Sequence, residues 1–268
     1  MSAILSVRGL EKTFGSVVAA RDISLDVPRQ QSVGIIGANG AGKTTFVNMI
    51  TGWLRPSKGS ILFEDRDITG LPSRAITRLG IARSFQVAQV FPSLTVYDNM
   101  AAAVAVARTR ASLLKSALTP LASAPARAET EELMTLFQLG AYREARSATL
   151  PQGVRKLLDI AMALVGAPRV LLLDEPTSGI SIEEKFAVME VIMTALASRR
   201  TTVLFVEHDM EIIARFAERV LAFHDGTVIA DGPPARALAD PMVQTLISGT
   251  VPIGVAAGEV VHAQGLRS

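Results

Sequence analysis

Residues 32–50 read SVGIIGANGAGKTTFVNMI, and this stretch decides the fold. It begins with a short apolar run, residues 32–36, of the kind that forms a buried strand. A glycine-rich segment follows, and residues 43–50 then have a helical pattern that Gly52 and Pro56 close. The stretch therefore predicts a strand, a loop and a helix in direct succession.

The loop at residues 37–45, GANGAGKTT, fits the pattern G-x-x-x-x-G-K-[ST]. Glycines let backbone N–H groups converge on phosphate oxygens, and the start of the next helix adds positive partial charge. In this pattern Lys43 reaches the β- and γ-phosphates of a nucleotide such as ATP, and the Thr44 hydroxyl ligates Mg²⁺. A chance glycine-rich turn is disfavoured because the loop joins a predicted strand to a predicted helix. The predicted nucleotide-binding residues are Gly37, Ala38, Asn39, Gly40, Ala41, Gly42, Lys43, Thr44 and Thr45.

Further apolar runs extend the pattern along the chain. Residues 60–63 are strand-like, and residues 169–173 and 202–206 are continuous apolar runs, typical of strands buried on both faces of a parallel sheet. Asp225-Gly226 separates two more strand-like runs, which predicts a hairpin. Alternating strands and helices predict an α/β fold with a largely parallel sheet.

Three regions complete the organisation of the chain. Ile182, Phe186, Met189 and Met193 recur at helical spacing and are predicted to pack in the core. Residues 97–164 are mostly helix-like, so we expect a helical subdomain inserted into the sheet domain. The prediction is one domain over residues 1–248 and a loosely attached tail over residues 249–268.

Two acids and a histidine follow predicted buried strands. Asp174 and Glu175 end one strand, and His208 follows another. Ligands bind at the carboxyl ends of parallel strands, so we expect Asp174 to hold Mg²⁺ through water and Glu175 to activate the attacking water. His208 is expected to contact the γ-phosphate. Solvated loop acids and an ordinary histidine are the alternatives, and the phosphate loop upstream disfavours them.

Two other residues have more open interpretations. The Gln86 side-chain amide is suited to bind Mg²⁺ or the attacking water, but the spacing also fits an ordinary loop residue. Phe14 precedes Gly15 in a turn, where its ring either stacks on an adenine or packs in the core.

Composition narrows the classes of protein. The chain has 268 residues, 49% hydrophobic and 19% charged, which indicates a folded globular protein. It has no cysteine, so it has neither disulfides nor thiolate metal ligands. The net charge of +2 is too small to indicate a nucleic-acid partner. No apolar run approaches the ~20 residues of a membrane span, and the start has no secretory pattern, so we expect a cytoplasmic protein.

In this order, the motifs resemble those of the ATP-binding subunits of ABC transporters from about Leu5 to Gly249. The resemblance implies a P-loop NTPase (RecA-like) core with an N-terminal antiparallel β part and an inserted helical subdomain. Its landmarks are an A-loop at Phe14, a Walker A loop at residues 37–45, a Q-loop at Gln86, a signature at residues 150–156, Walker B at residues 170–175, a D-loop at residues 178–181 and a switch histidine at His208.

The phrases DITGLPSRAITRLGIARSFQVAQVFPSLTVYDNM and VEHDMEII are similar to those of the uptake ATPases for branched-chain amino acids and related amino acids, amides or urea. That resemblance implies a pair of ATPases, identical or different, at the cytoplasmic face of the inner membrane. It also implies two membrane permeases and, indirectly, an extracytoplasmic binding protein. A groove between Gln86 and the helical subdomain, near Arg83 and Asp98, would receive a permease helix.

The signature of this chain, LPQGV, departs from the family's LSGGQ. Pro151 lacks the serine hydroxyl, whereas Gly153 is retained and is expected to offer its N–H to the partner's ATP. Proline also suits the start of a helix, so the helix and its dipole are expected to persist. Ser181 stands where the D-loop usually has aspartate or asparagine. The alternatives are a regulatory clamp with weak hydrolysis and the ATPase of a lipopolysaccharide-export system. A P-loop GTPase is disfavoured because the sequence has no guanine-reading NKxD, and a P-loop kinase is disfavoured because the arrangement of the signature and the histidine is wrong for one.

Overall fold

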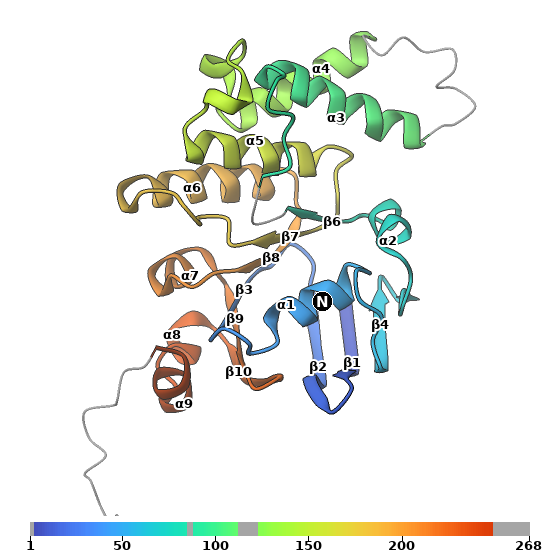
Figure 1. Ribbon diagram of the computed structural model, residues 1–268, viewed down its shortest axis with the longest axis vertical. Helices are drawn as coiled ribbons and strands as arrows, with labels where there is room; N and C mark the ends of the chain where they lie inside the picture. Colours follow the sequence, from blue (N-terminus) through green and yellow to red (C-terminus); the bar gives the residue numbers. More distant parts are fainter. Residues whose placement is uncertain (1–2, 85–87, 112–122, 249–268) are drawn as a thin grey trace, which may run out of the picture.

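A computed structural model describes residues 3–84, 88–111 and 123–248 of the chain. Two sheets and a group of helices make up this part of the molecule (Figure 1). Gln86 and the tail 249–268 lie outside the described residues, so the predicted domain boundaries stay a prediction. Among the described residues, no helix has the length and apolar character needed to cross a membrane.

The larger sheet has six strands in the order β10-β9-β3-β8-β7-β6. Strands β6 to β9 and β3 run parallel, and only β10 pairs antiparallel, with β9. This order brings the ends of β3, β7 and β8 together at one edge, although they are far apart in sequence. The strands are β3 (Ser32–Gly37), β6 (Ile81–Ser84), β7 (Val170–Asp174), β8 (Thr202–Val206), β9 (Arg219–His224) and β10 (Thr227–Gly232).

A second, antiparallel sheet has the order β2-β1-β4-β5, and Figure 1 shows it on the α1 side of the larger sheet. Its β1–β2 pairing has four register shifts, which interrupt the alternation of buried and exposed side chains. The implied N-terminal antiparallel part is therefore confirmed. The strands are β1 (Ala3–Phe14), β2 (Val17–Pro28), β4 (Lys58–Phe63) and β5 (Arg66–Asp67).

The helices cover both faces of the larger sheet. Helix α1 lies between the two sheets, and α6 lies on the opposite face, with α3, α4 and α5 stacked beyond it (Figure 1). Helices α3 to α5 lie in the chain between β6 and β7. The helices are α1 (Lys43–Ile50), α2 (Ser73–Leu79), α3 (Val96–Ala111), α4 (Ala124–Leu136), α5 (Gln152–Leu164), α6 (Ile182–Ser198), α7 (Met210–Phe216), α8 (Pro234–Ala237) and α9 (Pro241–Val243). Short 3₁₀ turns lie at Gly140–Tyr142 and Ser147–Thr149, and a π-helical turn lies at Gln244–Ser248.

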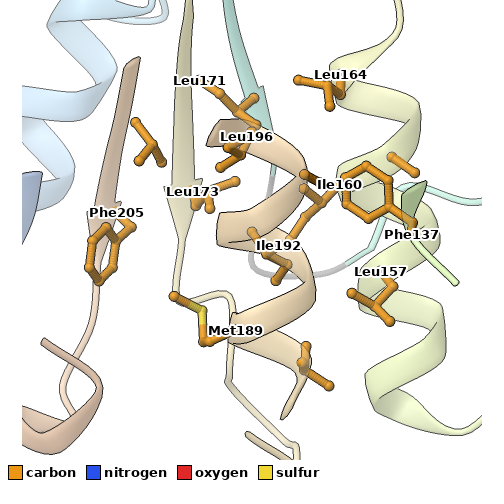
Figure 2. Close-up of a cluster of buried hydrophobic side chains, with 14 of the residues drawn as sticks. Phe137, Leu157, Ile160, Leu164, Leu171, Leu173, Met189, Ile192, Leu196 and Phe205 are labelled. Carbon is orange, nitrogen blue, oxygen red and sulfur yellow. The ribbon is translucent and has the colours of Figure 1, made fainter. Parts of the chain in front are cut away.

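Each face of the larger sheet has its own hydrophobic core. Leu171 and Leu173 of β7 face helix α6, where Met189 and Ile192 cover them (Figure 2). The alternate residue Leu172 belongs to the cluster shared with α1 and the antiparallel sheet. A strand buried on both faces must be apolar at every position, which explains the unbroken run in the sequence.

Several predicted elements match the structure closely. The predicted helix 43–50 and strand 202–206 coincide with α1 and β8, and the hairpin turn at Asp225-Gly226 has positive φ angles of 45° and 76°. One core prediction is wrong. Ile182 is 74% exposed because it is the first residue of α6, before the helix reaches the sheet, whereas Met189 is fully buried.

Candidate functional site

Two glycines of the loop between β3 and α1 are required by close contacts with the backbone. A Cβ at Gly37 would lie 2.5 Å from the carbonyl oxygen of Phe223, and one at Gly42 would lie 2.7 Å from that of Ala19. Gly42 also has a φ of 99° at the cap of α1, a conformation that other residues rarely adopt. The neighbouring strands β9 and β2 therefore hold the loop tightly against the start of the helix.

The β9–β10 hairpin fixes the loop from outside. The Gly226 N–H donates to the Ala41 carbonyl oxygen at 3.1 Å, and the Gly226 carbonyl accepts from the Arg21 N–H at 2.8 Å. One turn thus joins the loop to β2 through the backbone. Ala38, Asn39 and Gly40 at its crest are exposed, which leaves this part open to a ligand.

Lys43 folds back over the loop from the first position of α1. Its Nζ donates to the carbonyl oxygens of Gly37 and Ala38 at 2.6 and 2.9 Å. Burial lowers the pKa of the Lys43 ammonium, while the carboxylates of Glu175 and Asp174 oppose that shift. Lys43 therefore lies within electrostatic reach of the two acids at the carboxyl end of β7.

Asp174 ends β7 and pairs with an arginine from the adjacent strand. Arg83 donates through Nη2 to Asp174 at 2.6 Å and through Nη1 to Asn48 of α1 at 2.6 Å. The Arg83 side chain is only 9% exposed. Arg83 is therefore largely buried against Asp174 and Asn48, and the predicted permease groove stays a prediction because Gln86 lies outside the described residues. Asp98, by contrast, is exposed at the start of α3 and accepts from the Thr95 hydroxyl.

Glu175 and His208 meet across the ends of β7 and β8. His208 Nε2 and Glu175 Oε1 are 2.9 Å apart, and the Glu175 N–H donates to the Val206 carbonyl at 3.0 Å. Glu175 has a φ of 46°, a strained backbone conformation of the kind that is enriched at functional sites. The structure thus brings together the two residues expected to act on the γ-phosphate and the water.

A third acid at this edge, Glu207, was not among the predicted site residues. It follows β8, is almost fully buried, and accepts hydrogen bonds from Thr177 and from the His208 N–H. Burial raises the pKa of the Glu207 carboxyl, although these hydrogen bonds oppose the shift. In the sequence, Glu207 is marked only by its position next to His208. That position does not show whether the Glu207 side chain points toward the site.

The signature region begins helix α5 as expected. The Pro151 carbonyl accepts the first helical hydrogen bond, from the Arg155 N–H at 3.0 Å. Gly153 is buried, and a Cβ there would lie 3.0 Å from Val188 of α6, so packing against α6 favours glycine at this position. In the D-loop, the Ser181 hydroxyl caps α6 by accepting from the Glu184 N–H at 3.3 Å. Serine is a good cap, which gives the departure at Ser181 a structural role.

Phe14 is not a core residue. It is 50% exposed at the end of β1, and Lys12 Nζ lies 5.1 Å from the centre of its ring. Core packing is therefore excluded for Phe14, and stacking on a base is the alternative that remains.

The residues present fit a magnesium nucleotide. Within the described parts of the chain, no three His, Cys, Asp or Glu side chains are grouped to hold a metal ion by themselves. Mg²⁺ at nucleotide sites is usually held by one or two carboxylates together with phosphate oxygens and water. Asp174 and the exposed Thr44 beside the phosphate loop supply that kind of incomplete ligand set.

Comparison with known proteins gives concordant results. The sequence model of the family described as ABC transporter matches residues 20–178. The chain is 34% identical over 249 residues to the high-affinity branched-chain amino acid transport ATP-binding protein LivG of Escherichia coli (strain K12), covering 90% of this chain and 95% of that protein. It is also 34% identical over 251 residues to the lipopolysaccharide export system ATP-binding protein LptB of Acidithiobacillus ferridurans, covering 93% and 98%.

A solved structure shows the same fold. The ADP conformation of MJ1267, an ATP-binding cassette of an ABC transporter, superposes with a TM-score of 0.77 at 26% identity, covering 92% of this chain and 98% of that one. ABC ATP-binding subunits bind and hydrolyse ATP with Mg²⁺, dimerise and work with permease subunits. The chain belongs to the ABC transporter family as one of its ATP-binding subunits.

Proposed function

We propose that this chain is the ATP-hydrolysing subunit of an importer for branched-chain amino acids or related amino acids, amides or urea. The 34% identity to LivG over nearly the whole chain supports the importer branch. The main support for ATP hydrolysis is the pairing of Glu175 with His208 at 2.9 Å, beside the phosphate loop.

In this proposal the phosphates of ATP lie on the loop formed by residues 37–45. Their oxygens accept from the loop N–H groups, and Lys43 exchanges its bonds to Gly37 and Ala38 for the β- and γ-phosphates. The adenine stacks on Phe14. The helix dipole of α1 favours the added negative charge.

Glu175 accepts a proton from the attacking water, and His208 holds Glu175 and the γ-phosphate in place. Mg²⁺, held by Thr44, Asp174 and Gln86, would neutralise charge on the phosphate oxygens. Asp174 must then loosen its bond to Arg83. Gly153 of each subunit offers its N–H to the ATP of the other.

The proposed assembly is peripheral, at the cytoplasmic face of the inner membrane. A second ATPase, identical or different, pairs with this chain beneath two permease subunits, and an extracytoplasmic binding protein delivers the substrate. The substrate itself is chosen by those partners.

Two other functions are weighed against it. A lipopolysaccharide-export ATPase is supported by the equal identity to LptB, whereas the phrase RSFQ at residues 83–86 favours the importer branch. A regulatory clamp with weak hydrolysis is favoured by Pro151 but opposed by the intact pairing of Glu175 with His208.

Hydrolysis is tested by Glu175→Gln. The amide cannot accept the proton of water, so we expect ATP to bind normally while steady-state turnover falls to background. ATP binding by calorimetry and phosphate release, measured with the cognate partners present, give the two readouts. Normal turnover in this variant would exclude Glu175 as the base.

The importer branch is tested in the source cell. Deleting the gene should abolish uptake of radiolabelled leucine or a related amino acid or amide, and a tagged chain should copurify with two permeases. Normal uptake together with defective lipopolysaccharide export would favour the other branch.

A further inference from the structure

Three side-chain pairs join the segment after β7 to the loop after β8. Glu175 meets His208, Thr177 meets Glu207, and Lys185 forms an ion pair with Asp209. The partners follow one another in sequence as 207, 208 and 209. Glu207 and Thr177 are the buried pair, beneath the exposed edge on which His208 lies.

The Glu207 carboxylate bridges two separate backbone segments. Its Oε1 accepts from the Thr177 N–H at 2.9 Å and from the Thr177 hydroxyl at 2.8 Å. Its Oε2 accepts from the His208 N–H at 3.2 Å. Glu207 therefore fixes Thr177, two residues after Glu175, and the backbone of His208 at the same time.

Burying the Glu207 carboxylate costs free energy, because the charge loses its hydration. Glu207 is 4% exposed, and burial raises the pKa of its carboxyl. Burial lowers the pKa of the Lys156 ammonium, 1% exposed on α5, and the nearby carboxylates of Asp159, Asp174, Glu207 and Glu175 oppose that shift. Apolar side chains of similar volume are often as stable as buried ionic groups, so stability alone does not explain an acid here.

We propose that Glu207 is a positioning residue for ATP hydrolysis, which acts by holding the segment Glu175–Thr177 and the backbone of His208 in register. The inference rests on the roles proposed above for Glu175 and His208. Glu207 touches neither water nor phosphate in this role. It fixes the backbone positions from which the Glu175 and His208 side chains reach each other, and these positions persist when the two side chains exchange partners on binding ATP.

The test compares Glu207→Gln, Thr177→Val and Thr177→Ser in the full chain with its cognate partners. Glutamine keeps the volume but turns an NH₂ group toward the His208 N–H, and valine removes only the hydroxyl donor. We expect Glu207→Gln to lower kcat for ATP about tenfold and Thr177→Val about fivefold, with KM changed less than about twofold. Thr177→Ser should restore most of kcat.

Thr201→Val is the matched structural control. Thr201 is equally buried and also bears a hydroxyl hydrogen bond, to the Pro168 carbonyl at 3.2 Å, but it lies just before β8, at the opposite end of that strand. It should lower Tm as much as Thr177→Val does while leaving kcat unchanged. In double mutants, the effects of Glu207→Gln and Thr177→Val on kcat should be less than additive, and those of Glu207→Gln and Thr201→Val additive.

A wild-type kcat in Glu207→Gln would overturn the proposal. So would a loss of kcat in Thr201→Val equal to that in Thr177→Val, because the effect would then follow stability. Glu175→Gln and His208→Ala, assayed in parallel, distinguish a failure of the proposed function from a failure of the positioning role of Glu207. If they hydrolyse ATP normally, the proposed function fails; if only they are inactive and Glu207→Gln is normal, the positioning role alone fails.

Discussion

At the residue scale, the charged side chains of the site already have protein partners. Lys43 is bonded to two loop carbonyls, Asp174 to Arg83, and Glu175 to His208. A nucleotide therefore has to exchange these bonds for its own. The net free energy of each exchange is small compared with the strength of the bond itself, which allows the site to release its product.

Lys43→Ala should abolish most nucleotide binding and leave the fold intact. The variant loses a charge-assisted bond to phosphate of about 1.5–3 kcal/mol, so we expect the Kd for ATP to rise about ten- to a hundredfold. Calorimetry with ATP measures this. The matched control is Lys58→Ala, because Lys58 is exposed and pairs with Glu11 at 2.8 Å on the antiparallel sheet. Equal affinities in the two variants would place the nucleotide elsewhere.

Arg83→Glu should stop hydrolysis itself. The variant would turn a second carboxylate toward Asp174, inside a nearly buried cluster, so we expect basal ATPase activity to fall more than about tenfold. Asp98→Lys, a charge reversal on the exposed start of α3, should keep basal activity within about twofold and weaken transport. Phosphate release, measured without the permeases, gives the basal ATPase activity of each variant and so distinguishes the effect of Arg83→Glu from that of Asp98→Lys. Unimpaired activity in Arg83→Glu would contradict the importance of its pair with Asp174.

At the element scale, one hairpin controls the phosphate loop. The turn between β9 and β10 binds Ala41 and Arg21 through the backbone of Gly226. Its geometry follows from the local sequence, since Asp-Gly tolerates positive φ at both positions. Its contact with the loop is a product of the sheet order, which places β9 beside β3.

Gly226→Ala should weaken ATP binding beyond its effect on stability. The φ of 76° costs an alanine about 1–2 kcal/mol, and its Cβ would lie 3.2 Å from the Ala19 backbone. Gly166→Ala is the control, because Gly166 has a φ of 82° and its nearest neighbour would be 3.8 Å away. Both variants should lose similar stability in urea, and only Gly226→Ala should bind ATP more weakly. Equal affinities would show that the hairpin does not control the loop.

The sequence predicts the parallel core well because its elements are regular. The runs at residues 169–173 and 202–206 and the helix at 43–50 each have one period and clear ends, and they appear as β7, β8 and α1. Strands β1 and β2 are different, since four register shifts interrupt their alternation, and only the family resemblance indicated them. Ile182 fits the apolar period of α6 but lies at its exposed end.

The candidate site could likewise be predicted only where sequence motifs indicate it, and not where it depends on the direction of side chains. Lys43, Asp174, Glu175 and His208 follow from motifs at strand ends, and the sheet brings Glu175 and His208 into contact. The burial of Arg83 and the bridge made by Glu207 depend on side-chain direction between adjacent strands. Spacing along one chain does not contain that information.

At the scale of the whole molecule, the proposed pairing of two subunits assigns the start of α5 and the phosphate loop of one chain to two different ATP sites. In the proposed pair, Gly153 of one subunit faces the ATP held by residues 37–45 of the other. The D-loop lies beside it in the same chain, since Gln152 is the nearest side chain to Gly179. A change in the signature should therefore affect the association of two subunits more than the affinity of either for ATP.

Pro151→Ser tests this in the Glu175→Gln background, in which ATP is bound but not hydrolysed. With Mg²⁺ and ATP, we expect two chains of 28.4 kDa to associate, and the added hydroxyl should bond a phosphate of the facing subunit. One such bond to a charged group contributes about 1.5–3 kcal/mol, so the dimer Kd should fall at least about tenfold, while the Kd for ATP of the monomer stays the same. Sedimentation equilibrium measures the dimer Kd, and calorimetry of dilute protein measures the Kd for ATP.

The control is Lys43→Ala in the same background, which should remain monomeric with ATP. Because Pro151 only begins the helix and its carbonyl stays free to accept from Arg155, α5 itself should not change. An unchanged or higher dimer Kd would mean that this signature reaches the phosphate through backbone N–H groups and the helix dipole alone.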